Sequence, residues 1–200
     1  MNKFDNIPVA GCVLAGGKSK RMGTDKALLE FDGKTLLDHA IEKLSAFPEV
    51  VISAADSDDY AFAGVRVIPD DQPGIGPLGG FISVLRAVES DYVCFRPVDA
   101  PLIPAELHTM LADLCAGKDV AVPTHKGAIE PLIACVAKSA LPTIERLASL
   151  GKYKASDTFS LLDTAFIYLD SKDMLRTLGK PSEYLINAND PAAFAKLGKR

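Results

Sequence analysis

Short apolar runs alternate with longer stretches of helical period along almost the whole chain, and this alternation limits the fold more than any other feature. The apolar runs predict strands at Pro8–Leu14, Val50–Ala54, Val65–Ile68, Tyr92–Phe95, Val120–Val122, Leu132–Val136 and Phe166–Leu169. Near-continuous apolar strands separated by helices are typical of a mostly parallel sheet that is buried on both faces. We therefore expect an α/β protein with three layers, α-β-α, around a mixed but mostly parallel central sheet, and residues 1–200 as one domain.

The segments between these runs carry helix signals. Thr35 can cap a helix whose apolar stripe is Leu36, Leu37, Ala40, Ile41 and Leu44. Further helices are predicted at Pro77–Val88, from Pro104 onward, at Ser139–Leu150 and at Asp190–Leu197. The polar segment Gly151–Ser160 is interpreted as a mobile loop. His39 and His108 share no spacing that would suit a metal site, and we expect both on helix surfaces.

The charge of the chain is unevenly distributed. The formal net charge is −4, but residues 18–26 hold four cations and one anion, so that the remaining residues carry −7. The acidic bulk disfavours nucleic acid and anionic membranes as partners, and the longest uncharged run near the N-terminus, Asn6–Gly17, is too short to span a bilayer. With no leader pattern and no C-x-x-C pair, we expect a cytoplasmic protein with buried, reduced thiols. A nucleophilic cysteine stays open, although the sequence offers no evident histidine partner.

The basic stretch follows the first predicted strand directly, as Ala15-Gly16-Gly17-Lys18-Ser19-Lys20-Arg21-Met22-Gly23-Thr24-Asp25-Lys26. Glycines let backbone N–H groups approach a phosphate, and cations neutralise its charge. A Walker A loop would need a glycine where Cys12 stands, and Gly16, Gly17 and Gly23 have the wrong spacing for a dinucleotide-binding fingerprint. The alternative is a solvated basic turn, but four cations in nine residues of an acidic protein favour a site for a small polyanion.

The run from Leu14 to Leu29 reads L-A-G-G-x-S-x-R-M-G-x-D-K-A-L-L. It resembles the signature loop of the nucleotidyltransferases that have a glycosyltransferase-A-like fold, related to the nucleotide-diphospho-sugar transferases. Within that group it is most similar to the molybdenum cofactor guanylyltransferases. The resemblance implies that Leu14, Ala15, Gly16 and Gly17 bind the nucleotide, and that Arg21 and Lys26 are catalytic.

A second candidate segment follows the strand at Tyr92–Phe95 and ends in Arg96-Pro97-Val98-Asp99-Ala100-Pro101. Asp99 could be a turn-forming residue, or it could bind the Mg²⁺ that accompanies a triphosphate, since such ions are held by one or two carboxylates. The resemblance favours the metal, because the family has a C-D-x-P motif here whose aspartate binds Mg²⁺. Val98 replaces the usual cysteine of that motif.

Other segments match the family less completely. Asp70, in Pro69-Asp70-Asp71 ahead of Gly76-Pro77-Leu78-Gly79-Gly80, corresponds to an aspartate that contacts the nucleotide, whereas Asp71 reads as a solvated turn residue. The family's second strand often ends in asparagines that hold guanine, but here only Ser53 is available. Asn187 and Asn189, in Asn187-Ala188-Asn189-Asp190-Pro191, resemble an element near the pterin site, or else an N-cap cluster. Glu130-Pro131-Leu132 matches a strand entry of these enzymes.

The resemblance implies that the chain transfers GMP from GTP to molybdopterin with Mg²⁺ as cofactor, forming the guanine dinucleotide of the cofactor and pyrophosphate. No general base is evident, and none is needed if the attacking group is a phosphate that is already ionised. Two alternatives stay open, a CTP-using cytidylyltransferase and a nucleotide-binding adaptor without activity. Molybdoenzymes or their chaperones are further candidate partners.

Overall fold

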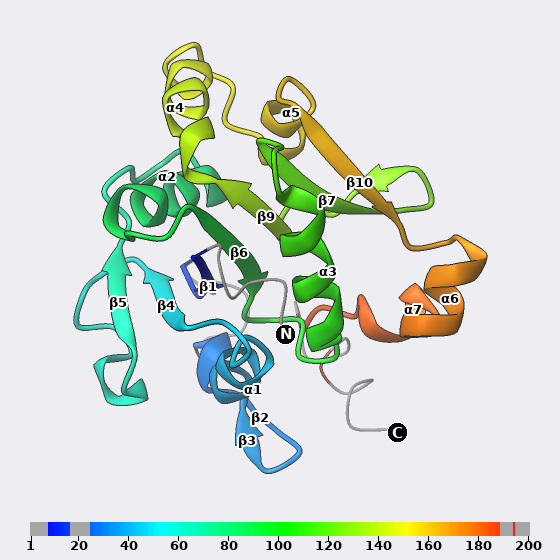
Figure 1. The fold of residues 1–200 in the computed structure, drawn as a ribbon. Coiled ribbons are helices and arrows are strands. Elements are labelled where there is room, and N and C mark those ends of the chain that lie inside the picture. The colour runs from blue at the N-terminus through cyan, green and yellow to red at the C-terminus, as the bar shows by residue number, and fades with distance from the viewer. Residues whose placement is uncertain (1–7, 17–24, 189–193, 195–200) are drawn as a thin grey trace.

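The computed structural model describes residues 8–16, 25–188 and 194, and it confirms a mixed, mostly parallel sheet with helices on both faces (Figure 1). The strands run in the order β10-β7-β9-β6-β1-β4-β5, and the short strand β8 pairs with β7. Their bounds are β1 Val9–Leu14, β4 Glu49–Ala54, β5 Arg66–Pro69, β6 Tyr92–Pro97, β7 Val120–His125, β8 Ala128–Ile129, β9 Ala134–Ala137 and β10 Thr164–Tyr168. The neighbours of β1, β4 and β6, are both parallel to it.

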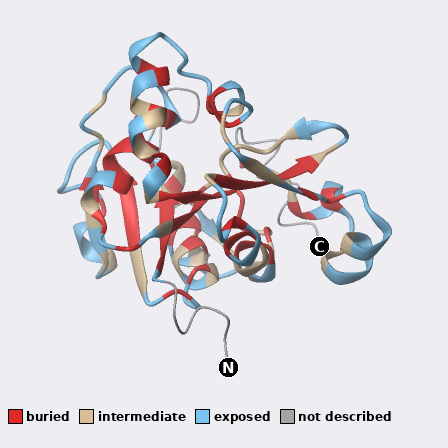
Figure 2. Ribbon diagram, turned by 45° about the horizontal axis from the view of Figure 1, so that its top comes forward, coloured by how far each residue is buried: buried red, intermediate tan, exposed pale blue. Residues whose placement is uncertain are grey.

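The helices form two layers. Their bounds are α1 Leu36–Lys43, α2 Pro77–Ala87, α3 Ala105–Cys115, α4 Leu141–Ser149, α5 Ala155–Phe159, α6 Lys172–Leu178 and α7 Pro181–Tyr184. Apolar side chains of α1 and α3 form one core cluster with the sheet, and those of α2, α4 and α5 form a second one. Figure 2 shows the central strands as largely buried and the outer helix surfaces as exposed. Among the described residues, no helix is long and apolar enough to cross a membrane.

The strand order reverses direction at β1, and this reversal determines where a ligand can bind. The chain moves from β1 to β4 by way of α1 on one face, and it returns from β5 to β6 by way of α2 on the other face. In open α/β sheets, ligands bind in the crevice beyond the carboxyl ends of the strands at such a switch point. The loops after β1 and β6 are therefore the place to look for the site.

The structure also differs from the sequence-based predictions. Gly151–Ser160 is not simply a loop, because it contains α5, whose Phe159 is fully buried and packs edge-on against Phe81 of α2. His108 is fully buried on α3 rather than exposed, and burial lowers its pKa to about 3, so it is neutral. The short pair β2 Glu30–Phe31 and β3 Lys34–Thr35, and the helices α6 and α7, were not predicted. The predicted helix Asp190–Leu197 lies almost entirely outside the described residues.

The cysteines agree with their prediction. Cys12, Cys94, Cys115 and Cys135 are all buried and free. Burial raises the pKa of the Cys12 thiol far above its usual range. A thiol that stays protonated is a poor nucleophile, so the structure gives no support to a catalytic role for Cys12.

Candidate active site

The end of β1 is fixed by backbone hydrogen bonds on both sides. The N–H of Ala15 donates to the carbonyl of Ser53 at 2.9 Å, and the N–H of Val98 donates to the carbonyl of Leu14 at 3.1 Å. These bonds continue the parallel pairing of β1 with β4 and β6 past the last strand residue. The backbone that leads into the glycine-rich loop is thereby held by its two neighbouring strands. Gly16 is exposed, and of the described residues a Cβ atom there would meet only the Ser53 carbonyl, at 4.0 Å.

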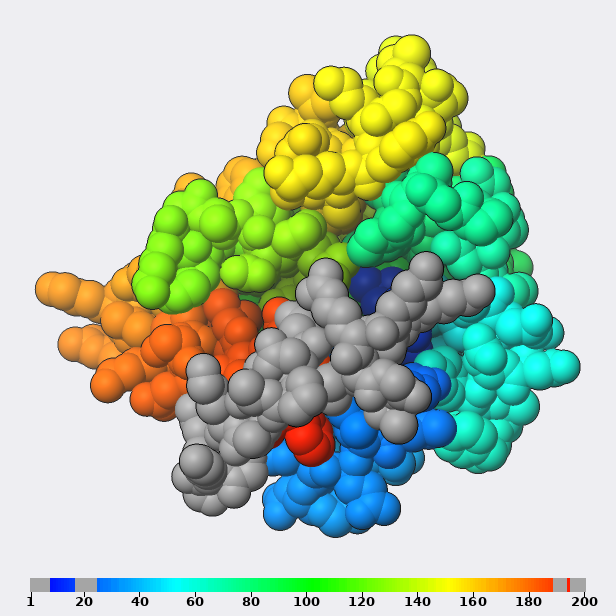
Figure 3. Space-filling view, turned by 180° about the vertical axis from the view of Figure 1, so that it is seen from behind, coloured from blue at the N-terminus to red at the C-terminus, as the bar shows by residue number. Residues whose placement is uncertain are grey.

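Lys26 and Asp99 come together at this switch point. Lys26 Nζ lies 3.4 Å from Asp99 Oδ2, and each side chain is 20% exposed. The two residues are 73 positions apart in the sequence. Their meeting depends on the parallel pairing of β1 with β6, which brings the two loops to the same edge of the sheet. In Figure 3 the dark-blue atoms of residues 8–16 reach the surface beside the blue atoms of the segment that follows residue 24.

Asp25 and Tyr60 hold the backbone around Lys26. Asp25 caps the short 3-10 helix Lys26–Leu28, because its Oδ1 accepts from the N–H of Ala27 at 3.0 Å. Its Oδ2 accepts from the Tyr60 hydroxyl at 2.7 Å. Tyr60 is buried, and burial together with the Asp25 carboxylate raises the pKa of its hydroxyl well above the usual range. The hydroxyl is therefore a lasting donor, and it ties the Lys26 turn to the segment after β4.

The loop that carries Asp99 is attached to the fold by its backbone. The Asp99 carbonyl accepts from the N–H of Ala188 at 2.7 Å, which brings the C-terminal segment, Asn187 included, against this loop. Arg96 donates from Nη2 to the Ala100 carbonyl at 2.7 Å and from Nη1 to the Ile103 carbonyl at 3.0 Å. The backbone of the Asp99 loop is thus held by bonds that do not involve the Asp99 carboxylate.

Arg96 is a fully buried cation, and no ion pair joins it to a carboxylate of the described residues. Burial lowers its pKa to about 9, so the guanidinium stays charged at neutral pH. Sequence reasoning did not identify this residue, although a charged side chain within an otherwise apolar run is a signal. Burying a charged side chain costs free energy. The planar guanidinium group of arginine can offset part of that cost here, because it donates to two carbonyls at once.

Arg96→Lys should lower the free energy of unfolding by about 2–4 kcal/mol, because one ammonium cannot replace two directed donors and is harder to dehydrate. Urea unfolding followed by circular dichroism measures this change. Arg66→Lys is the matched control, since Arg66 has a side chain that is 55% exposed, and we expect it to change stability by less than about 0.5 kcal/mol. Equal free energies of unfolding for the two variants would show that the stability of the Asp99 loop does not depend on the guanidinium group of Arg96.

Asp70 and Ser53 lie on the β4–β5 side of the switch point, where the first turns of α2 pack against them. The N–H of Asp70 donates to the Ala54 carbonyl at 2.8 Å, and its Oδ1 accepts from the N–H of Gln72 at 2.9 Å. A Cβ atom on Gly79 would lie 2.6 Å from Asp70 Oδ1, and one on Gly80 would lie 2.7 Å from Ser53 Oγ. Only glycines allow α2 to approach these side chains so closely.

Gly79→Ala should destabilise the fold by about 2 kcal/mol, even though alanine is the better helix former, because the added methyl group overlaps the Asp70 carboxylate and the Gln72 carbonyl. Thermal unfolding measures the change. Gly16→Ala is the control, because its Cβ atom would have no neighbour among the described residues closer than 4.0 Å. If Gly79→Ala unfolds at the wild-type temperature, α2 is able to move away from Asp70 at little cost.

The predicted site residues therefore fall into two groups, those at one edge of the sheet and those outside the described residues. One sheet edge brings together Leu14, Ala15, Gly16, Lys26, Ser53, Asp70, Asp99 and Asn187. Ser53 is 3% exposed and covered by α2, so its backbone supports the loop while its contact with a base stays a prediction. Gly17, Arg21 and Asn189 lie outside the described residues. Asp71, predicted as a solvated turn residue, is exposed but accepts from Arg86 at 2.8 Å.

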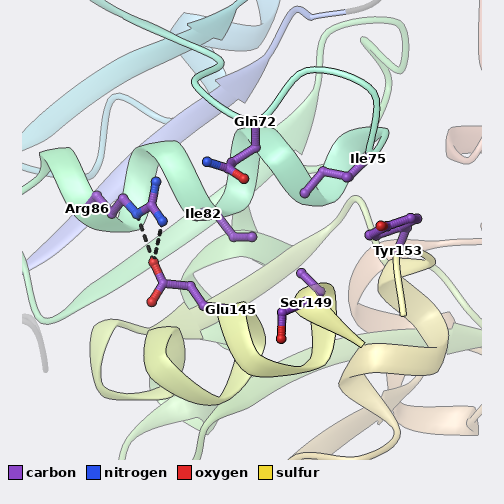
Figure 4. Close-up of a pocket in the computed structure, with 8 residues that line it drawn as sticks. Gln72, Ile75, Ile82, Arg86, Glu145, Ser149 and Tyr153 are labelled. Carbon is purple, nitrogen blue, oxygen red and sulfur yellow. Dashed lines mark hydrogen bonds and ion pairs between the residues drawn. The ribbon is translucent and has the colours of Figure 1, made fainter. Parts of the chain in front are cut away.

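A cavity of about 240 Å³ lies elsewhere, between α2 and α4 (Figure 4). Arg86 and Glu145 of α4 both line it, and they pair at 2.6 Å. None of the predicted site residues lines this cavity. The cavity lies between α2 and α4, two helices that pack in the second core cluster. It is therefore a feature of that packing and does not lie at the end of β1.

The donor set at the sheet edge suits a divalent cation that is bound mainly through a nucleotide. Among the described residues, no group of three or more His, Cys, Asp or Glu side chains could hold a metal ion on its own. Asp99 supplies one partly exposed carboxylate, and Mg²⁺ typically takes one or two carboxylates together with phosphate oxygens and water. The Asp99 carboxylate therefore fits a metal that arrives with a triphosphate.

Comparisons with known proteins agree with this geometry. Residues 11–164 match the MobA-like NTP transferase domain family. A protein of Carboxydothermus hydrogenoformans named "Probable molybdenum cofactor guanylyltransferase" is 37% identical, over 98% of this chain and 97% of its own. A protein of the same name from Pelotomaculum thermopropionicum is 32% identical, over 95% of this chain and 92% of its own. The solved structure of molybdopterin-guanine dinucleotide biosynthesis protein A from Archaeoglobus fulgidus is similar with a TM-score of 0.79 at 26% identity, covering 95% of this chain and 97% of that one.

Proposed function

Because the chain belongs to the MobA-like NTP transferase domain family, we propose that it is a molybdenum cofactor guanylyltransferase, which transfers GMP from GTP to molybdopterin. The observation that carries the proposal is the meeting of Lys26 and Asp99 at the end of β1. A cation and a carboxylate side by side can serve a metal-bound triphosphate, since the cation faces phosphate and the carboxylate faces metal. The names of the relatives supply the two substrates.

In this proposal the reaction is an in-line displacement at the α-phosphorus. An oxygen of the terminal phosphate of molybdopterin attacks, a new P–O bond forms, and the bond from the α-phosphorus to the bridging oxygen breaks, so that pyrophosphate leaves with that electron pair. The backbone of Ala15, Gly16 and Gly17 cradles phosphate oxygens. Lys26 and Arg21 stabilise the negative charge that collects on the α-phosphate and the leaving pyrophosphate.

The remaining predicted residues bind and orient. Asp99 would hold Mg²⁺, whose charge, when it is bound, screens the triphosphate and polarises its phosphorus–oxygen bonds. Asp70 and Ser53 would support the nucleoside on the β4–β5 side, and Asn187 and Asn189 the pterin. The attacking phosphate is already an anion at neutral pH, so the site needs to position the reactants and neutralise charge, and it needs no general base.

The test is pyrophosphate release by the purified protein supplied with molybdopterin, Mg²⁺, and either GTP or CTP. We expect release with GTP and at least about tenfold less with CTP at equal concentration, a difference of about 1.4 kcal/mol between the transition states. A preference for CTP would make the protein a cytidylyltransferase. Tight GTP binding in calorimetry without any pyrophosphate would instead favour the inactive nucleotide-binding adaptor.

A further inference from the structure

The end of β7 reaches the same edge of the sheet as the loop that carries the proposed metal ligand. Cys94 of β6 and Ala121 of β7 both pair with Cys135 of β9, and both pairings are antiparallel. β7 is therefore parallel to β6, and Cys94 and Ala121 are level with each other. From these positions β6 and β7 both continue toward the same edge of the sheet, where β6 ends at Pro97 and β7 ends at His125.

Glu130 lies in the segment that joins β8 to β9, between these two strand ends. Its N–H donates to the Pro123 carbonyl of β7 at 2.9 Å, and its carbonyl accepts from the N–H of Ile133 at 3.1 Å. The first bond fixes Glu130 beside β7, and the second forms the tight turn that leads into β9. Because β9 runs between β7 and β6, the turn at Glu130 lies at the edge of the sheet where these two strands end.

The carboxylate of Glu130 has acceptor capacity that the described residues do not use. It is half-buried, and it makes no hydrogen bond or ion pair with a described residue. Burial raises its pKa, an effect that the nearby His125 partly opposes. Water can supply donors on the exposed side of this carboxylate, and a ligand that supplies donors of its own can displace that water.

His125 pairs with a different carboxylate, that of Asp170, so it is not the hydrogen-bond donor for Glu130. His125 Nδ1 lies 3.0 Å from Asp170 Oδ1, and Asp170 Oδ2 accepts from the N–H of Lys126 at 2.7 Å. That backbone bond, above all, lowers the pKa of Asp170, so its carboxylate is ionised and can only accept. Nδ1 must therefore carry the proton, and its hydrogen bond to Asp170 holds the imidazole ring.

We propose that Glu130 binds the pterin ring of the acceptor, with its two carboxylate oxygens accepting from the exocyclic 2-amino group and the adjacent ring N–H. This inference rests on the proposed function, because it places the ring of the molecule whose phosphate attacks beside Asp99. A carboxylate matches this pair of donors in a bidentate manner, and hydrogen bonds to an ionised group are the strong ones. The site thereby gains a residue that selects the acceptor.

Guanine presents the same pair of donors as a pterin, so the two rings have to be distinguished. The proposed nucleoside side lies at β4 and β5, with Ser53 and Asp70, whereas Glu130 lies beyond β6 on the opposite side of β1. A single GTP with its α-phosphate at the end of β1 extends to one side only. The carboxylate on the far side is therefore assigned to the acceptor.

Titration calorimetry with a pterin that carries a phosphorylated side chain tests the assignment. The comparison ligand is the corresponding lumazine, which has an oxo group in place of the 2-amino group. Wild-type protein should bind the pterin at least about tenfold more tightly than the lumazine. Glu130→Gln should lose at least about tenfold in pterin affinity and lose this discrimination, because its amide N–H₂ now faces a donor. Glu183→Gln, on the exposed surface of α7, removes the same charge elsewhere and should behave as wild type.

Each outcome decides the assignment. Equal pterin and lumazine affinities in the wild-type protein would overturn it without any mutation, and so would equal pterin binding by the two glutamine variants. A loss of GTP affinity in Glu130→Gln, with pterin affinity unchanged, would assign the carboxylate to guanine instead. Because these measurements read binding alone, a protein that binds the pterin as described and yet releases no pyrophosphate would refute the proposed function while leaving the Glu130 site standing.

Discussion

Asp99→Asn should lower kcat/KM for GTP by about 10³-fold, which corresponds to about 4 kcal/mol of transition-state stabilisation. The amide keeps the shape of the side chain but removes the charge that would hold a divalent cation. The fold should persist, because Val98, Ala188 and Arg96 hold this loop through backbone atoms. Initial rates of pyrophosphate release over a range of Mg²⁺ concentrations give the measurement.

Two readouts separate metal binding from a general disturbance of the site. In Asp99→Asn the Mg²⁺ concentration for half-maximal rate should rise at least about tenfold, a change of about 1.4 kcal/mol in metal binding. Asp58→Asn, an exposed carboxylate on the surface, should leave both the rate and the Mg²⁺ dependence unchanged. A variant at position 99 with a normal Mg²⁺ requirement and a slow rate would show that Asp99 acts on Lys26 and does not bind the metal.

The parallel sheet could be predicted because its signal is local and strong. β1, β4 and β6 are short apolar runs, and buried parallel strands need this composition whatever surrounds them. The glycines and cations after β1 are contiguous in the sequence, so they indicate a candidate site, although residues 17–24 of that segment lie outside the described residues. The place of Asp99 after a strand and ahead of a proline fits a turn as well as a metal ligand, and only the family resemblance favours the metal.

Features that depend on tertiary contacts could not be predicted. α5 has a polar sequence, and it is helical where Phe159 inserts beside Phe81, a partner far away in the sequence. The acceptors of Arg96 are the carbonyls of Ala100 and Ile103, and loop geometry alone brings them together. His108 was predicted on the surface because helical period leaves the width of the buried face of α3 undetermined.

The support of Lys26 by Asp25 and Tyr60 was missed for a related reason. An aspartate ahead of a short turn is a common cap, so the pattern at Asp25 carries little information by itself. The tyrosine that fixes its second oxygen is 35 residues further along the chain. The Tyr60 hydroxyl and the Asp25 carboxylate together orient the turn that begins with Lys26.

Lys26→Ala should have the largest effect of any single change, a loss of about 10³–10⁴-fold in the rate of pyrophosphate release, or about 4–5.5 kcal/mol. The ammonium lies in a partly buried position beside Asp99, where a charge acts more strongly than it does in water. Lys34→Ala is the control, because Lys34 is an exposed cation of the same type that pairs with Glu42 on the surface. A rate near that of the wild type in Lys26→Ala would remove this residue from the mechanism.

The position of the ammonium should matter as well as its charge, and Tyr60→Phe tests this. Without the hydroxyl, Asp25 loses the 2.7 Å hydrogen bond to its second oxygen, and the turn at Lys26 loosens while every charge of the site remains. We expect kcat to fall about 5–20-fold, with little change in the KM for GTP, because orientation is needed most in the transition state. Lys26→Arg should recover little of the activity of Lys26→Ala, since a planar, forked cation cannot occupy the place of a compact ammonium. If Tyr60→Phe leaves kcat unchanged while Lys26→Ala abolishes it, the charge of Lys26 alone is sufficient, and the Asp25–Tyr60 contact serves only the fold.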